Sequence, residues 1–281
     1  MYSFSFWLLF YFLFYGRIRC KKTKLKAVFI YEINETFSNL LPTYLLYLNK
    51  ITMKKIGLVG GTGWVSTLDY YRYFNELIYK NTKGECTAEV IINSVNYPAI
   101  AKLTAAGKWD DIAKIMTDAA LALQSAGAEC ILLGANTMHN VAPQVRSAIG
   151  IPFIHIAEET GKKILEKGIN KVALLGTKYT MQLPFFKDTL TDMDIETIIP
   201  NDADTAIINA GIYNELALGI ITEKTKESYL QIMQKLQQTG AEGIILGCTE
   251  IPLLIKDKDF DLPLFDTTFI HASAAVNFSL G

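Results

Sequence analysis

One stretch of the sequence occurs twice, and this repeat sets the strongest limit on how the chain can fold. The first copy reads GAECILLGANT over residues 127–137, and the second reads GAEGIILGCTE over residues 240–250. Each copy follows a long amphipathic pattern and runs a short apolar segment into a glycine and a small polar cluster. This pattern is typical of a buried strand that ends in a ligand-binding loop. The repeat therefore predicts two lobes related by pseudo-symmetry.

Apolar segments alternate with amphipathic segments in both halves of the chain. They predict strands at 55–60, 88–93, 130–134 and 151–155, and again at 171–176, 195–199, 243–246 and 262–266. Fully apolar strands between helices are typical of parallel sheets covered on both faces. We therefore expect an α/β fold of two pseudo-symmetric lobes, each a mostly parallel sheet flanked by helices. Residues 53–168 plus 265–281 would form the first lobe, and residues 169–264 the second.

The first 52 residues differ from the rest in composition. They carry seven Lys or Arg and two Asp or Glu, and residues 4–15 form an almost unbroken aromatic and aliphatic run. This run is shorter than the roughly 20 residues that a spanning helix needs. We interpret residues 1–52 as a non-homologous extension from a misassigned start, with Met53 as the natural start, or as a short anchor. A membrane contact is expected only if residues 4–15 are translated and inserted.

Charge and cysteine content exclude several classes of partner. Residues 53–281 are acidic and show no basic stripe, which argues against nucleic acid. The four cysteines lack CxxC or Cys/His ligand spacing, so we expect free thiols, no metal site and a reducing, cytoplasmic compartment.

The polar clusters fall where the predicted strands end. Ligands of open parallel sheets bind at the carboxyl ends of the strands, so we expect the active site in the cleft between the lobes. The five strand ends are residues 60–64, 94–97, 135–137, 177–180 and 248–250. They supply the candidate substrate ligands Thr62, Asn96, Asn136, Thr137, Thr177, Thr180, Thr249 and Glu250.

The two repeats differ at one chemically decisive position, where Ala135 in the first copy corresponds to Cys248 in the second. A cysteine at a strand end before a helix is expected to have a lowered pKa, which makes its thiolate available as a base or nucleophile. We therefore predict that Cys248 is catalytic. Cys86 and Cys130 are expected to be buried thiols.

The glycine-rich turn at residues 61–66 resembles a dinucleotide-binding fingerprint, but the acid expected at the end of the second strand is missing. We interpret it as a turn that lets the backbone approach a small anionic ligand.

Several other polar residues have two interpretations. Asn136, Thr137 and Thr249 could cap helices, bind carboxylate oxygens, or do both. His139 lies one turn after Thr137 and could line the site or only pack. His155 and His271 are expected to be structural.

Four motifs in order resemble the aspartate/glutamate racemase family, the cofactor-independent amino-acid racemases. They read GGTGWVST (60–67), NTMH (136–139), GCTEIP (247–252) and FDTTFIH (265–271). The resemblance covers residues 53–281 and is greatest to the broad bacterial branch of the family.

The resemblance implies an isomerase that acts at Cα of an aspartate- or glutamate-like substrate without a cofactor, and that forms a homodimer. In this family one cysteine from each lobe removes or returns the Cα proton, so Cys248 would be one of that pair. Asn136, Thr137 and Thr249 would bind the α-carboxylate, and Thr62 and residues 177–180 would line the remainder of the site.

Ala135 departs from this family pattern, which has cysteine or, in some members, threonine there. A methyl group cannot carry a proton, and three outcomes follow. A water or a neighbour such as Thr137 stands in, giving a slow or one-sided racemase. The enzyme is a single-cysteine decarboxylase of the same superfamily. Or the protein binds amino acids without turning them over.

Overall fold

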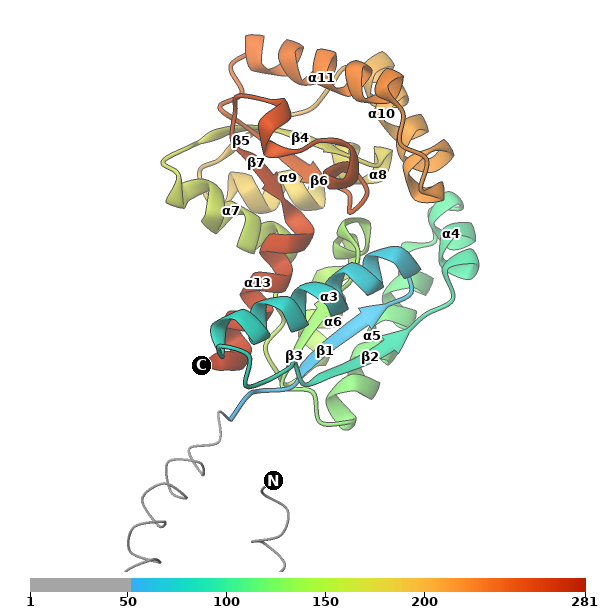
Figure 1. The fold of residues 1–281 in the computed structure, drawn as a ribbon. Coiled ribbons are helices and arrows are strands. Elements are labelled where there is room, and N and C mark those ends of the chain that lie inside the picture. The colour runs from blue at the N-terminus through green and yellow to red at the C-terminus, as the bar shows by residue number, and fades with distance from the viewer. Residues whose placement is uncertain (1–51) are drawn as a thin grey trace, which may run out of the picture. The chain divides into compact units, whose positions relative to one another are not determined.

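The computed structural model describes residues 52–281, which form two parallel sheets flanked by helices (Figure 1). The extension predicted at 1–52 lies outside the described residues except for Thr52, and the apolar run at 4–15 lies wholly outside them. Within residues 52–281, no helix has both the length and the apolarity that crossing a bilayer requires. The predicted α/β class and its two parallel, helix-covered sheets are confirmed.

The first sheet has the strand order β2-β1-β3, with every pair parallel. The central strand β1 is buried along its whole length, because helices cover both faces of the sheet. The elements in chain order are β1 (Ile56–Gly60), α3 (Trp64–Asn81), β2 (Val90–Ser94), α4 (Tyr97–Ala105), α5 (Trp109–Ser125), β3 (Cys130–Leu133), η1 (Asn136–Val141) and α6 (Ala142–Ala148).

The second sheet has the order β5-β4-β6-β7 and is also parallel, so its first three strands repeat the order of the first sheet. Its elements are α7 (Ile156–Glu166), β4 (Lys171–Gly176), α8 (Lys178–Gln182), α9 (Pro184–Thr191), β5 (Glu196–Ile198), α10 (Asp202–Asn214), η2 (Leu216–Leu218), α11 (Glu223–Gln238), β6 (Gly243–Gly247), α12 (Ile251–Leu254), η3 (Asp257–Asp259), β7 (Leu264–Asp266) and α13 (Thr267–Leu280).

Two predicted boundaries between the lobes need correction. Strand β7 pairs with β6 in the second sheet, although residues 265–281 were assigned to the first lobe. Helix α7 was also assigned there, but its buried side chains Ile156 and Ile164 pack with Val172 and Leu174 of β4. Helix α13 starts beside β7 and packs its later turns against α3, so it joins the two sheets (Figure 1).

The strand predicted at 151–155 is reduced to a single bridge between Ile131 and Phe153. Two backbone hydrogen bonds accompany this bridge. The Ile131 N–H donates to the Pro152 carbonyl, and the Ile154 N–H donates to the Ile131 carbonyl. A further difference is α4, which occupies a segment where no helix was expected.

The three histidines of the sequence meet in the interior, although they lie far apart along the chain. The ring centroids of His139 and His155 are 4.8 Å apart, and those of His139 and His271 are 5.4 Å apart. All three are buried. The expectation that His155 and His271 are structural agrees with their contacts, because His155 caps α7 and the His271 ring bonds to Tyr70 and to the Ile154 carbonyl.

Burial keeps this cluster neutral. It lowers the pKa of His155 to about 3 and that of His271 to about 4, and Arg146 adds to the effect on His155. The pKa of His139 is lowered well below its usual value, by burial and by the two neighbouring rings. Within residues 52–281, no group of three or more His, Cys, Asp or Glu side chains is arranged to hold a metal ion.

The cluster predicts that the protein loses stability in mild acid. Because the folded pKa values lie below the unfolded value near 6.5, the unfolded chain takes up more protons as pH falls below 6.5. The stabilisation is complete above pH 6.5 and is lost as pH falls towards 4, by up to about 1.4 kcal/mol per pH unit for each histidine.

Urea denaturation at pH 7.5 and pH 5 tests this prediction. His155→Asn is the matched variant, since asparagine also caps helices but does not titrate. Its free energy of unfolding should fall less between the two pH values than that of the wild type. Equal pH dependence in both proteins would contradict a contribution from His155.

Candidate active site

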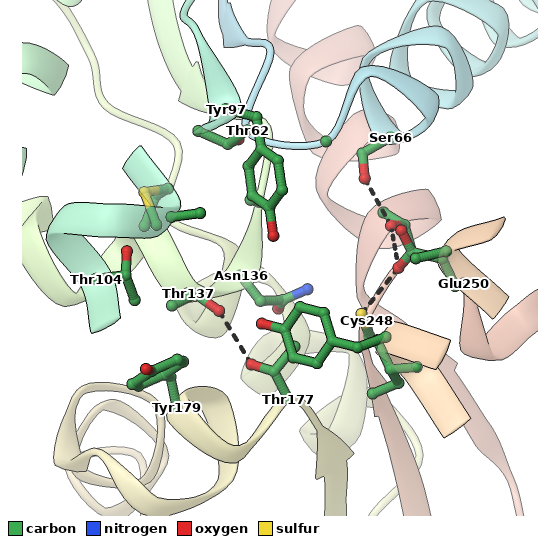
Figure 2. Close-up of a pocket in the computed structure, with 18 of the residues that line it drawn as sticks. Thr62, Ser66, Tyr97, Thr104, Asn136, Thr137, Thr177, Tyr179, Cys248 and Glu250 are labelled. Carbon is green, nitrogen blue, oxygen red and sulfur yellow. Dashed lines mark hydrogen bonds between the residues drawn. The ribbon is translucent and has the colours of Figure 1, made fainter. Parts of the chain in front are cut away.

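A cavity of about 610 Å³ lies between the two sheets, at the carboxyl ends of their strands (Figure 2). The loops that follow β1, β3, β4 and β6 contribute to its wall, as do α4 and α10. Parallel strands present their carboxyl ends at one edge of a sheet, so two facing sheets of this topology enclose such a site. The position predicted for the active site, between the lobes, is where this cavity lies.

Equivalent positions of the two repeats face this cavity. Val59 of β1 pairs with Leu133 of β3, and Gly176 of β4 pairs with Gly247 of β6. Ala135 and Cys248 follow β3 and β6 at the same point of each repeat, and both line the cavity.

Cys248 belongs to a chain of hydrogen bonds that begins at its own thiol. Its Sγ donates to Glu250 Oε2 over 2.8 Å, and the Thr249 hydroxyl donates to the same oxygen over 2.7 Å (Figure 2). The Ser66 Oγ lies 2.6 Å from Thr249 Oγ1. Since Thr249 gives its proton to the carboxylate, Ser66 is the donor in that bond. The thiol proton therefore already points at a carboxylate.

The pKa predicted for Cys248 from its place at a strand end is wrong in direction. Burial raises the pKa of the Cys248 thiol well above its ordinary value, and the negative charge of Glu250 raises it further. The backbone N–H groups of the loop lower it by less. At neutral pH Cys248 is therefore a protonated thiol.

Ala135 presents only a methyl group, and its backbone is held by His139. The Ile156 N–H donates to His139 Nε2 over 3.3 Å, so Nδ1 carries the proton and donates to the Ala135 carbonyl over 3.1 Å. His139 thus fixes the loop that carries Ala135 but does not line the cavity. The open question about His139 resolves to packing and backbone support.

Donor counting fixes the orientation of the Asn136 amide. The Thr267 hydroxyl donates its only proton to the Leu246 carbonyl, so it accepts from Asn136 Nδ2 over 3.0 Å. The Asn136 Oδ1 is left buried and without a partner, as is the Thr62 hydroxyl, and both residues line the cavity. An unpaired buried acceptor is costly unless a ligand satisfies it.

Three threonine hydroxyls meet at another part of the wall. Thr137 Oγ1 lies 3.2 Å from both Thr177 Oγ1 and Thr180 Oγ1, which are also 3.2 Å apart. Thr137 and Thr177 line the cavity, whereas Thr180 is fully buried behind them. Thr180 therefore supports the other two hydroxyls and does not face the cavity.

The other candidate ligands divide in the same way. Thr62, Thr249 and Glu250 line the cavity. Asn96 does not: it is exposed, and it is the residue before the first turn of α4. Its backbone carbonyl accepts bonds from that turn, so its role here is structural.

Three tyrosines also line the cavity, namely Tyr97, Tyr179 and Tyr213. Tyr97 and Tyr179 lie within the strand ends expected at the site, although neither is among the predicted ligands, and Tyr213 lies on α10, outside those segments. Burial raises the pKa of the Tyr97 and Tyr213 phenols, with Glu250 and Cys248 contributing, so both are neutral hydrogen-bond donors at physiological pH. The Tyr179 ring packs edge-on against Trp109. No motif marks isolated tyrosines, and only the fold brings them together.

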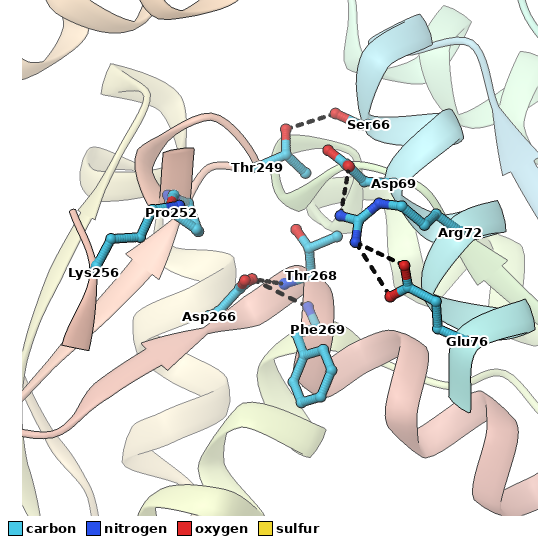
Figure 3. A network of polar contacts seen from close by, with 10 residues as sticks. All are labelled: Ser66, Asp69, Arg72, Glu76, Thr249, Pro252, Lys256, Asp266, Thr268 and Phe269. Atoms are coloured by element: carbon cyan, nitrogen blue, oxygen red, sulfur yellow. Dashed lines mark hydrogen bonds and ion pairs between the residues drawn. The ribbon is translucent and has the colours of Figure 1, made fainter. Parts of the chain in front are cut away.

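Polar contacts next to the cavity join α3 to the second sheet (Figure 3). The Ser66–Thr249 bond connects α3 to the loop after β6. Nearly two turns further along α3, Arg72 forms ion pairs with Asp69 and Glu76 of the same helix, and Asp266 caps α13. Of these contacts, the Ser66–Thr249 bond is the one that crosses from α3 to the loop of the second sheet.

A family model described as Asp/Glu/Hydantoin racemase matches residues 59–275, which is most of the chain. The chain belongs to this racemase family. The resemblance found from the four motifs is thereby confirmed.

Individual racemase-family proteins are similar over most of the described residues. A proposed Asp/Glu racemase from Yersinia pestis is 44% identical with a TM-score of 0.78, and the match covers 82% of this chain and 100% of that one. PH1733, an aspartate racemase homologue from Pyrococcus horikoshii OT3, is 38% identical with a TM-score of 0.73, covering 81% and 99%. The broad specificity amino-acid racemase RacX of Bacillus subtilis is 27% identical over 175 residues, which is 60% of this chain and 72% of RacX.

The contact between Cys248 and Glu250 makes a prediction about thiol reactivity. Glu250→Gln removes the negative charge that raises the Cys248 pKa, so the thiolate fraction should increase at a given pH. Alkylation of the Cys248 peptide by iodoacetamide, followed by mass spectrometry between pH 7 and 9, should be faster in this variant. Cys86 in the same sample is the internal control. An unchanged Cys248 rate would contradict the electrostatic effect of Glu250.

Proposed function

We propose that this protein exchanges the Cα proton of aspartate- or glutamate-like amino acids, with Cys248 as its principal acid and base and without pyridoxal phosphate. The observation that supports this most directly is the 2.8 Å hydrogen bond from the Cys248 thiol to Glu250 at the wall of the cavity between the lobes. Membership of the racemase family supports an amino acid as the substrate.

Substrate binding uses the unpaired groups of the wall. The Asn136 Oδ1 is an acceptor, so it binds the α-ammonium of the substrate, whereas the family resemblance had placed Asn136 on the carboxylate. The unpaired Thr62 hydroxyl donates to the α-carboxylate, together with the Thr137 hydroxyl from the threonine cluster. These donors stabilise the negative charge that develops on the carboxylate when the Cα proton leaves. Thr249, which the family resemblance had also placed on the carboxylate, gives its only proton to Glu250 and holds the loop instead.

The proposed proton transfers begin at the Cys248 thiol. Glu250 accepts the Cys248 proton, and the positive α-ammonium beside the sulfur stabilises the thiolate that forms. The thiolate then takes the Cα proton, and the electron pair of the broken C–H bond moves into the carboxylate. The Cys248 thiol returns a proton to Cα, and Glu250 then returns the first proton to the sulfur, so the enzyme ends in its starting protonation state. Solvent hydrogen enters Cα when the thiol proton exchanges with water before it is returned.

The second face of Cα decides whether this exchange inverts the amino acid. Ala135 holds that position and cannot donate a proton, and the neighbouring Thr137 hydroxyl is engaged with two other threonines. Return of the proton from Cys248 alone regenerates the starting enantiomer. We therefore expect a one-sided enzyme in which Cα exchange is faster than inversion.

Ala135 also favours one alternative, a single-cysteine decarboxylase. In that reaction a disubstituted malonate loses CO2, and Cys248 protonates the resulting enolate from one face. A protein that binds amino acids without turnover is the remaining alternative. We also propose a homodimer and a cytoplasmic location, in line with the family resemblance.

Incubation with L-aspartate or L-glutamate in D2O tests the proposal, with deuterium at Cα and the D-enantiomer followed together. We expect deuterium to enter faster than the D-enantiomer forms. Cys248→Ser should lower exchange by at least about 10²-fold, because the catalytic acid and base is lost. Cys86→Ser is the matched control and should retain exchange.

Each other result has a definite meaning. Exchange and inversion at equal rates would show that a second proton donor replaces the missing cysteine. Absence of exchange on both substrates would overturn the acidic-amino-acid assignment. Release of CO2 from a disubstituted malonate, dependent on Cys248, would then support the decarboxylase.

Ala135→Cys should add inversion to exchange. A thiol at this position supplies a proton to the second face of Cα, so the ratio of D-enantiomer formed to deuterium incorporated should rise by about tenfold or more. Ala135→Ser is the control, since its hydroxyl is too weak an acid to take the same role. An unchanged ratio in Ala135→Cys would contradict the placement of Ala135 opposite Cys248.

A further inference from the structure

The cavity wall carries few charged side chains, and these differ in the hydrogen bonds and ion pairs that they already make. Among the described residues that line it, Lys178 is the only basic side chain and Glu250 the only acidic one. Glu250 already accepts hydrogen bonds from Cys248 and Thr249. Lys178 lies on the rim, exposed to solvent, and also lines a second cavity formed largely by α10.

The pairing of β4 with β6 places Lys178 close to the loop that carries Cys248. Gly176 and Gly247 are paired across neighbouring strands, which in a sheet are about 4.8 Å apart. Lys178 and Cys248 follow these glycines within two residues. The Lys178 N–H donates to Asn209 Oδ1 over 2.8 Å, which fixes its backbone against α10 and leaves the side chain unconstrained.

Lys178 has no ion pair within the described part of the chain, because no carboxylate oxygen lies within 4.0 Å of its ammonium. Lys226 and Lys235, in the same half of the molecule, are both paired with aspartates. An unpaired ammonium on the rim of a ligand cavity attracts anions, and desolvation by a bound ligand strengthens that attraction.

On the side of the main cavity, the other lining groups add donors and, apart from Glu250, no negative charge. Asp202 lines the second cavity together with Lys178, but its carboxylate does not come within 4.0 Å of the ammonium. The three tyrosines line the main cavity, and the phenols of Tyr97 and Tyr213 are neutral donors. Neutral phenols and one ammonium together suit a carboxylate, which only accepts hydrogen bonds.

We propose that Lys178 is a specificity-determining residue that binds a distal carboxylate of the substrate, so that acidic amino acids are preferred over their uncharged amides. This inference rests on the proposed function for the location of the substrate. It adds the residue that reads the substrate side chain, which the sequence analysis left open.

Calorimetric titration of the full chain with L-glutamate and L-glutamine at 0.15 M ionic strength measures this preference without requiring turnover. The two ligands have almost the same shape and differ in the charge of the distal group. The wild type should bind glutamate about tenfold or more tightly than glutamine, as expected for one charge-assisted contact. Lys178→Met should abolish this preference and leave the affinity for glutamine within about twofold.

Two further variants make the test specific. Lys178→Arg keeps the charge and should keep the preference. Lys102→Met removes an exposed, unpaired lysine on α4 that does not line the cavity, and it should also keep the preference. Thermal unfolding of each variant checks that it remains folded.

The proposal and the proposed function can fail separately. A glutamate preference that depends on Lys178, without Cα exchange, would support the specificity role and overturn the racemase chemistry. Cα exchange without any glutamate preference, or a preference that survives in Lys178→Met, would overturn the role of Lys178 alone. Failure of both ligands to bind would overturn it as well.

Discussion

The hydrogen bond from the Cys248 thiol to the Glu250 carboxylate is the interaction on which the proposed chemistry of the site depends. It links two residues of one short loop, and the loop is held by Thr249, which bonds to Ser66 on α3. Burial and the carboxylate charge keep the sulfur protonated until a cation arrives. The α-ammonium of an amino acid is such a cation, so the proposed function couples substrate binding to activation of the thiol.

The pseudo-symmetry of the two lobes explains why two equivalent loops reach the site and why the difference between Ala135 and Cys248 matters. Duplicated sheets bring two equivalent loops to one cavity, which is the geometry that two-sided proton transfer requires. In this chain only one loop keeps a titratable group, and the other presents Ala135. The first loop retains its support nonetheless, because His139 holds the Ala135 carbonyl and Thr267 orients Asn136. In the proposed function, the fold preserves substrate binding while proton transfer is confined to one face.

The sequence was most informative where apolar strands end in polar loops. Cys248, Thr62, Asn136 and Glu250 all line the cavity as predicted. Predictions failed where tertiary contacts decide: Asn96 lies outside the cavity, and the Cys248 pKa moves upward because burial and Glu250 outweigh the loop amides. The gathering of the three histidines and the place of Tyr213 in the cavity wall were not predictable, because distant elements bring these side chains together and no local pattern records it.

The most direct test of the account is the titration of the Cys248 thiol itself. The ultraviolet absorbance of the thiolate would be followed against pH in wild type minus Cys248→Ser, with and without L-glutamate. We expect a pKa well above that of an ordinary cysteine without L-glutamate, and a clear decrease when the amino acid binds. A thiolate already present at neutral pH without L-glutamate, or a pKa that binding leaves unchanged, would contradict this expectation.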